Sequence, residues 1–288
     1  MRILGIAIIA LILHGCAGFA TNAEYLEGAP ATLMPRSATY IDLVSLPRPS
    51  APIRAAVYDF RDQTGQYRPA PASTFSTAVT QGGAAMLTSA MSDSGWFTPL
   101  ERAGLQNLLT ERRIIRAAYE NQGMNGDISA LNPARILLEG GIIAYDSNLR
   151  TGGAGAEYFG IGASGQYQVD QVTVNLRAID IFTGEILGNV TTSKTVYSQE
   201  VRAGVYRFVS FRRLLEAEAG LTTNEPVQMA VMSAIESSLI HLIVQGVDKG
   251  LWSLANQSDY NIEVMEAYRN APVPMLTNVR LSDNSQVQ

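Results

Sequence analysis

Residues 164–170 read Ser-Gly-Gln-Tyr-Gln-Val-Asp, and residues 198–205 read Ser-Gln-Glu-Val-Arg-Ala-Gly-Val. Polar and apolar residues alternate with a period of two in both stretches. This period predicts β-strands that have one polar and one apolar face. The same alternation occurs in residues 145–151 and 215–221. The four stretches together predict two β-hairpins, with turns near residues 158–162 and 208–212.

The alternation assigns the residues of these hairpins to two faces. Polar residues hold the even-numbered positions, and we expect them to face water inside a barrel. These lumen positions are Ser164, Gln166, Gln168, Asp170, Glu200, Arg202, Glu216 and Glu218. The apolar positions expected to face lipid are Phe159, Tyr167, Val169, Val201, Ala203 and Phe208. Four strands cannot close a barrel, since about eight are needed, so a spanning sheet requires a homo-oligomer. The alternative is an amphipathic sheet on the core of a soluble domain.

The N-terminus carries the pattern of a secretion signal. Met1-Arg2 is followed by an apolar run, residues 3–13, that is too short to span a bilayer. The sequence Leu13-His14-Gly15-Cys16 then resembles the lipobox of bacterial lipoproteins, in which the cysteine is lipidated. We therefore expect removal of residues 1–15, lipidation of Cys16 and an outer-membrane location. The alternative is an ordinary signal peptide with an incidental cysteine.

The rest of the chain predicts an α+β fold in which a periplasmic α/β domain carries the two hairpins. Strands are expected at 53–60 and 136–143, and helices at 77–92, 101–121, 227–247 and 262–269. The helix at 227–247 is long enough to cross a membrane, but Glu236 and His241 favour a core helix. The expected regions are a signal peptide (1–15), a lipidated tether (16–52), the first part of the periplasmic domain (53–144), the first hairpin with its return strand (145–181), the second hairpin (182–222), and C-terminal helices with a polar tail (223–288).

Composition excludes several classes of protein. The chain is 47% hydrophobic and 16% charged, unlike a disordered chain, and its net charge of −5 makes a nucleic-acid partner unsuitable. One cysteine and two histidines predict neither a disulfide nor a Cys/His metal site. The glycine-rich run at 160–165 precedes a strand pattern instead of the helix that a dinucleotide site needs. We therefore expect no cofactor, no metal and no enzymatic activity.

Longer motifs carry a family resemblance over most of residues 32–254. They include DQTGQ (62–66), WFTPLER (96–102), LQNLLTER (105–112), TGEIL (183–187) and TNEP (223–226). With these motifs the chain resembles the curli secretion channel family of outer-membrane lipoproteins, CsgG. The resemblance implies a closed ring of about nine subunits, each of which contributes two hairpins to one large barrel. It also implies passive, ATP-independent export of unfolded curli subunits.

The resemblance further implies a constriction loop within residues 62–76. Family members carry a tyrosine and an asparagine–phenylalanine pair there, and the matching positions here are Ala70, Thr74 and Phe75. Only Phe75 keeps the family residue. The implied partners are a periplasmic factor that caps the vestibule and a surface factor that couples export to fibre nucleation. The alternative function is a non-channel structural lipoprotein of an envelope assembly.

Overall fold

The structure is a computed structural model of the 288-residue chain. It describes residues 31, 33, 35–67, 76–152, 157–158, 161–162, 165–201, 205–208 and 225–272. Within these ranges, only the backbone is described for residues 148–169 and 197–226. The chain divides into two units, Met1–Arg36 and Ser37–Gln288. Every helix and strand named below belongs to the second unit.

A six-stranded mixed sheet organises this unit, with the strand order β2-β1-β3-β6-β7-β8. The strands are β1 (Ile53–Asp62), β2 (Phe97–Leu100), β3 (Ile136–Gly152), β6 (Gly165–Asp180), β7 (Ile186–Val201) and β8 (Val205–Phe208). β1 runs parallel to β2 and to β3. β3, β6, β7 and β8 pair antiparallel in that order. A separate short pair, β4 (Glu157–Tyr158) and β5 (Ile161–Gly162), lies between β3 and β6 in the sequence.

The part of the sheet that packs against helices has one buried and one polar face. Along β6 the even-numbered side chains from Val172 to Ala178 are fully buried. The odd-numbered side chains are polar, and several of them bond across the sheet. Asn175 Nδ2, for example, donates to Asn189 Oδ1 at 2.7 Å and to Thr191 Oγ1 at 3.0 Å. This alternation is the pattern of an antiparallel sheet that is covered on one face only.

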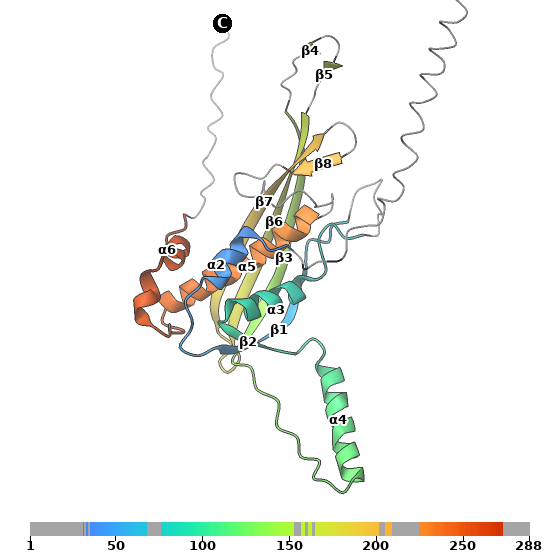
Figure 1. The fold of residues 1–288 in the computed structure, drawn as a ribbon, viewed down its shortest axis with the longest axis vertical. Helices are drawn as coiled ribbons and strands as arrows, with labels where there is room; N and C mark the ends of the chain where they lie inside the picture. Colours follow the sequence, from blue (N-terminus) through green and yellow to red (C-terminus); the bar gives the residue numbers. More distant parts are fainter. Residues whose placement is uncertain are drawn as a thin grey trace, which may run out of the picture. The chain divides into compact units, whose positions relative to one another are not determined.

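Helices cover the apolar face (Figure 1). They are α2 (Ala38–Val44), α3 (Gly83–Ser94) and α5 (Glu225–Asp248), which pack on each other and, for α3 and α5, on the strands. Among the described residues α5 is the one helix with the length and hydropathy of a membrane span, but 67% of that window is buried within the fold. It is therefore the core helix that its polar residues predicted.

Two further helices complete the fold. α6 (Glu263–Arg269) follows a short 3-10 helix, η2 (Gln257–Asn261), and packs on α5. α4 (Leu105–Asn121) lies between β2 and β3 in the sequence, and none of its 17 residues is buried. Its apolar residues, among them Leu109, Ile115 and Tyr119, are thus uncovered in a single chain.

The prediction of a mixed α+β fold is confirmed, with differences at the element level. β3 runs from Ile136 to Gly152 and so joins the strand predicted at 136–143 to the alternating stretch predicted at 145–151, and α3 begins at Gly83 instead of 77. The short strand β2 and the helix α2 were missed. α2 lies inside the segment predicted as an extended tether, where the Ser37 hydroxyl caps it by accepting from the Tyr40 amide at 3.2 Å. Leu43 and Leu46 anchor this part of the predicted tether in the core.

Candidate functional site

Much of the predicted site lies outside the described residues. These positions are Cys16, Ala70, Thr74, Phe75, Phe159, Ser164, Arg202, Ala203, Glu216 and Glu218. Backbone positions alone are described for Gln166, Tyr167, Gln168, Val169, Glu200, Val201 and Phe208. Asp170 is the one predicted site residue whose side chain the structure describes. The register of the long strands therefore carries the structural information on the two faces.

The β6–β7 ladder groups the predicted faces as the alternation suggested. Gln166 lies opposite Glu200, and Val169 lies opposite Tyr197. Residues directly opposite each other in an antiparallel ladder occupy the same face of the sheet. The expected lumen positions Gln166 and Glu200 are thus on one face. The expected lipid-facing position Val169 is on the other.

Two assignments conflict with the register. Phe208 lies opposite Ser198, so it shares a face with Glu200 instead of standing on the opposite, lipid-facing side. On β3, Arg150 lies opposite Tyr167, so the even positions of β3 share a face with the odd positions of β6. A register shift between Ile142 and Ala144 produces this reversal, because an extra residue in one strand inverts the face of every residue beyond it.

Asp170 is not a water-facing lumen residue in this structure. Its side chain is only 3% exposed, and its Oδ1 accepts a hydrogen bond from the Tyr145 hydroxyl at 3.2 Å. Asp170 falls in the same row of β6 as the buried Val172 and Val174. The even-numbered positions of β6 are therefore polar before Asp170 and belong to the buried core from Asp170 onward.

The second hairpin reverses earlier than predicted. β7 and β8 pair Val201 with Val205, so the chain turns between these two residues and not at 208–212. The sequence between them contains Gly204, and glycine is a residue type that favours turns. The first hairpin agrees better with the prediction, since Tyr158 pairs with Ile161 at its tip.

The long strands leave two edges open. β1 follows β3 only as far as Ile142, so the upper half of β3, to Gly152, pairs only with β6 among the described residues. β8 likewise pairs only with β7 in the described part of the chain. Exposed strand edges carry unpaired N–H and C=O groups that readily accept another strand. The two open edges lie on opposite sides of the same sheet and belong to strands that project beyond the helix-covered part.

A polar clamp holds the base of the predicted constriction loop. Asp62 Oδ1 accepts from the Thr64 amide at 2.9 Å and its hydroxyl at 2.6 Å, while Asp62 Oδ2 accepts from Gln81 Nε2 at 3.0 Å. Tyr67 forms an antiparallel bridge to Thr77, and the Ala78 amide donates to the Gln66 carbonyl at 2.9 Å. The two ends of the loop are therefore fixed side by side.

The Gln63 side chain, which was not among the predicted site residues, bonds this clamp to the sheet. Gln63 Nε2 donates to the Gly140 carbonyl at 3.1 Å, and a Cβ on Gly141 would lie 2.3 Å from the Arg61 carbonyl oxygen. The double glycine thus permits the close approach of β1 and the loop base to β3. The Asp-x-Thr-Gly spacing at 62–65 was the available signal, because it is typical of an Asx turn.

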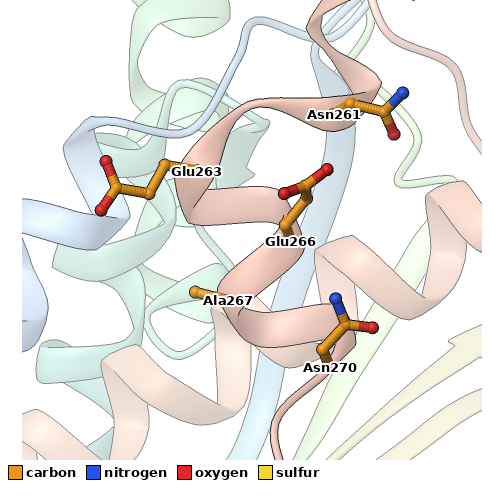
Figure 2. Close-up of a pocket in the computed structure, with 5 residues that line it drawn as sticks. All are labelled: Asn261, Glu263, Glu266, Ala267 and Asn270. Atoms are coloured by element: carbon orange, nitrogen blue, oxygen red, sulfur yellow. The ribbon is translucent and has the colours of Figure 1, made fainter.

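Two surface hollows in the described part of the chain lie near α6. The larger one is an open surface hollow over η2 and α6, lined by Asn261, Glu263, Glu266, Ala267 and Asn270 (Figure 2). It offers two carboxylates and two amides, with no nucleophile and base in contact. Within the described ranges no three His, Cys, Asp or Glu side chains are grouped so that they could hold a metal ion.

The mixed sheet with helices on one face defines the chain as an α+β protein, and its open strand edges and uncovered α4 leave surfaces that the described part of the chain does not pair. The profile of the family described as curli production assembly/transport component CsgG matches residues 36–271. The CsgG component of Salmonella typhimurium is 52% identical over 273 residues, which cover 93% of this chain and 97% of that protein. Its Escherichia coli K12 counterpart is 51% identical over 278 residues, with coverages of 95% and 99%. The chain belongs to the CsgG family, and the resemblance read from the sequence motifs is confirmed.

Solved structures resemble the chain weakly. Lipoprotein GNA1162 from Neisseria meningitidis aligns with a TM-score of 0.25 at 15% identity, over 53% of this chain and 89% of that one. A PelC dodecamer from Paraburkholderia phytofirmans aligns with a TM-score of 0.25 at 12% identity, over 65% and 93%. TM-scores this low do not establish a shared fold.

Proposed function

We propose that this protein is a subunit of an outer-membrane channel that exports unfolded curli-type amyloid subunits from the periplasm. The chain matches nearly the full length of relatives that are named curli production assembly/transport components. This match supports a curli transport role. The resemblance to the curli secretion channel family implies that export is passive and needs no ATP. The chain is lipid-anchored through Cys16 on the periplasmic side.

The single observation that carries the proposal is the pair of open edges of the antiparallel strands, one on the long strand β3 and one on the short strand β8. β3, β6 and β7 have 17, 16 and 16 residues, more than the 9–11 or so that a tilted spanning strand requires. In lipid each backbone group must be paired, so only a closed barrel is stable. If β8 of one copy pairs with the upper half of β3 of the next, identical subunits close one barrel. Any closed ring satisfies this head-to-tail rule, and the resemblance to the curli secretion channel family implies about nine copies.

The constriction completes the channel. A loop clamped at both ends can present Phe75 to the axis of the ring at a fixed height. An aromatic ring of this kind suits an unfolded chain, because it offers no fixed hydrogen bonds and resists wetting. Ala70 and Thr74 replace the family's tyrosine and asparagine, so the passage is wider than in relatives with the full motif. A periplasmic factor caps the vestibule, and a surface factor couples export to fibre nucleation.

Single-channel recording in planar bilayers tests the proposal. We expect the purified oligomer to conduct, Phe75→Ala to raise conductance without dissolving the oligomer, and Ala70→Tyr to lower it. The competing function is a non-channel structural lipoprotein, and an oligomer with no conductance would support it. Phe75→Ala could instead dissociate most of the oligomer and leave the conductance of the remaining oligomers unchanged. In that case Phe75 packs the loop and does not line the pore.

A further inference from the structure

The turn between β6 and β7 exposes an apolar surface that the chain itself does not cover. Ile181, Phe182 and Ile186 are 46%, 71% and 55% exposed within six consecutive residues. Single exposed apolar residues are common, but three large ones at one tight turn form a patch. Residues 181–186 are called the apolar turn below.

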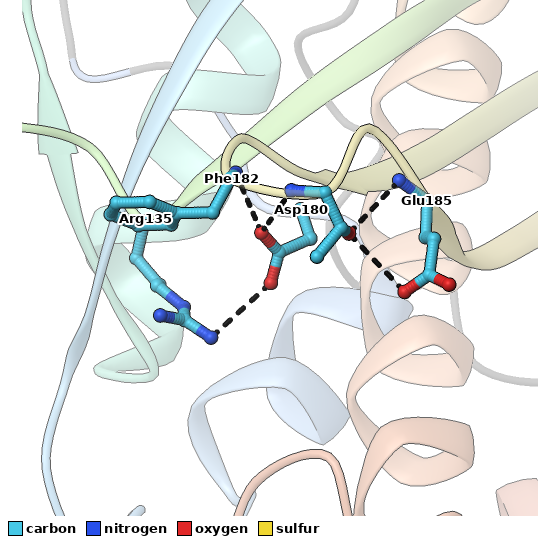
Figure 3. A network of polar contacts seen from close by, with 5 residues as sticks. Arg135, Asp180, Phe182 and Glu185 are labelled. Atoms are coloured by element: carbon cyan, nitrogen blue, oxygen red, sulfur yellow. Dashed lines mark hydrogen bonds and ion pairs between the residues drawn. The ribbon is translucent and has the colours of Figure 1, made fainter.

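The apolar turn is held rigidly by a buried carboxylate (Figure 3). Asp180 Oδ1 accepts from the Phe182 amide at 2.7 Å and the Thr183 amide at 3.3 Å, while its Oδ2 pairs with Arg135 at 3.2 Å. The Arg135 guanidinium also stands 5.0 Å from the centre of the Phe182 ring. Gly184, at φ +75°, closes the turn. A side chain fixed in this way loses little conformational entropy when a partner covers it.

The helix α4 presents a matching surface. Leu109, Ile115 and Tyr119 are exposed at 37%, 39% and 39%, and their spacing places them on one face of the helix. Contacts with the return segment involve its polar groups, such as Arg112 with the Ser129 carbonyl. In proteins most of the stability of a helix comes from packing of its apolar face, yet none of the 17 residues of α4 is buried. Its apolar face therefore needs a partner surface.

Charge complements the apolar match. Arg116 is exposed and lies on the same face as Leu109 and Tyr119, seven residues after the first and three before the second. Glu185 is exposed within the apolar turn. α4 as a whole carries three arginines against two glutamates. An apolar contact flanked by an arginine–carboxylate pair has the composition of a specific interface.

We propose that α4 of one copy docks on the apolar turn of the next copy, with Arg116 facing Glu185. The two surfaces differ, and each occurs once per chain, so the contact is head-to-tail and propagates around a ring. Within one chain Arg135 connects the two surfaces. It pairs with Asp180 at the apolar turn, and it immediately precedes β3, the strand that follows the α4 segment. This inference rests on the proposed homo-oligomer and names the contact that orders its periplasmic part.

Cysteine cross-linking in the full-length, membrane-embedded protein tests the docking. The Ile115→Cys, Ile186→Cys double variant should form a ladder of disulfide-linked multimers under mild oxidation. Neither single variant should do so. Ile114 is also exposed but lies on the opposite face of α4, so Ile114→Cys with Ile186→Cys is the matched control and should give no ladder.

Charge reversal supplies a second, independent readout. Arg116→Glu and Glu185→Arg should each reduce the multimer fraction on native gels several-fold, and the double reversal should restore it. An intact wild-type oligomer with no ladder and no effect of either reversal would overturn the docking and leave the channel proposal standing. A wild-type protein that forms no oligomer would overturn both. Cross-links to a different protein would assign the apolar turn to another partner and refute this contact.

Discussion

At the scale of single residues, Gly140 and Gly141 decide how closely β1, β3 and β6 approach one another. A Cβ on Gly140 would lie 2.0 Å from the Asn175 carbonyl oxygen, and its φ of +153° is one that other residues rarely adopt. The Asn175 carbonyl oxygen, and the Arg61 carbonyl oxygen that a Cβ on Gly141 would meet, are backbone atoms of paired strands. Neither atom can move aside without its strand. The sequence marks this place only as a double glycine within an apolar run.

We therefore expect Gly140→Ala to destabilise the folded protein by about 1–3 kcal/mol, the usual range for overpacking. Chemical denaturation of the purified protein measures the change. Gly82→Ala is the matched control, because its added Cβ would meet only Thr80 Oγ1 at 3.4 Å. Equal stability of the two variants would show that the strands separate more easily than the geometry indicates.

His241 is the residue through which we expect pH to act on the helical layer. Its ring meets the Tyr268 ring edge-on at 4.9 Å, and the Tyr268 hydroxyl donates to Asp42 Oδ2 at 3.0 Å. Burial lowers the pKa of His241 below its ordinary 6.5. Burial and the Asp42 carboxylate raise the pKa of Tyr268, so Tyr268 stays a donor at physiological pH.

The sign of the pH effect follows from proton binding. Between pH 6.5 and the lowered folded pKa, the unfolded chain binds the His241 proton more readily than the folded chain does. The free energy of unfolding therefore falls as pH drops through this window, and His241 has no effect above it. We expect His241→Gln to lose less thermal stability than wild type between about pH 7.5 and pH 5. Parallel melting curves for the two proteins would contradict this assignment.

At the scale of elements, α2 and the long strands show where local sequence patterns mislead. α2 has only seven residues, too few for a periodic signal, and tertiary bonds hold it. The Ser37 hydroxyl donates to the buried Glu236 carboxylate, and Thr39 Oγ1 lies 2.7 Å from Ser233 Oγ. Both partners lie nearly 200 positions away on α5. No local pattern in residues 16–52 could have revealed them.

The register makes a testable prediction for the projecting strands. If Cys16 is acylated as proposed, its thiol is unreactive, and single cysteines placed elsewhere can be labelled with a small polar reagent. Gln168→Cys and Ser198→Cys should label alike, and Val169→Cys and Tyr197→Cys should be protected alike. Leu149→Cys should follow Gln168→Cys, because the two lie opposite each other beyond the register shift. Labelling of Asn148→Cys and Arg150→Cys instead would restore the face assignment that the alternation predicted.

At the scale of the whole molecule, the proposed lipid anchor at Cys16 would hold the proposed barrel subunits at the membrane. Two or more acyl chains on one terminus give stable membrane anchoring, whereas one chain does not. We expect Cys16→Ser to leave the protein soluble in the periplasm and to abolish most export. Cell fractionation and metabolic labelling with palmitate measure this. A Cys16→Ser protein that still fractionates with the outer membrane would show that the anchor is dispensable.

The sequence by itself determined the elements whose side chains repeat at a regular period. The strands β1, β3 and β6 and the helices α4, α5 and α6 were found, because residues that share one face of a strand or helix recur with a period of 2.0 or 3.6. The motifs also identified the family, which the profile match over residues 36–271 confirms. Period and motif are local properties, so a single chain of letters contains them.

Only the tertiary structure decided what each face meets. The register shift at 142–144 reverses the faces of β3 beyond residue 144. Asp170, which was predicted to face the lumen, instead accepts a buried hydrogen bond from the Tyr145 hydroxyl. The clamp at Asp62 joins residues on either side of a loop, and α4 is uncovered although its stripe is regular. These features depend on pairings between residues far apart in the sequence. Alternation cannot reveal such pairings, because it states that a face is buried and not which surface buries it.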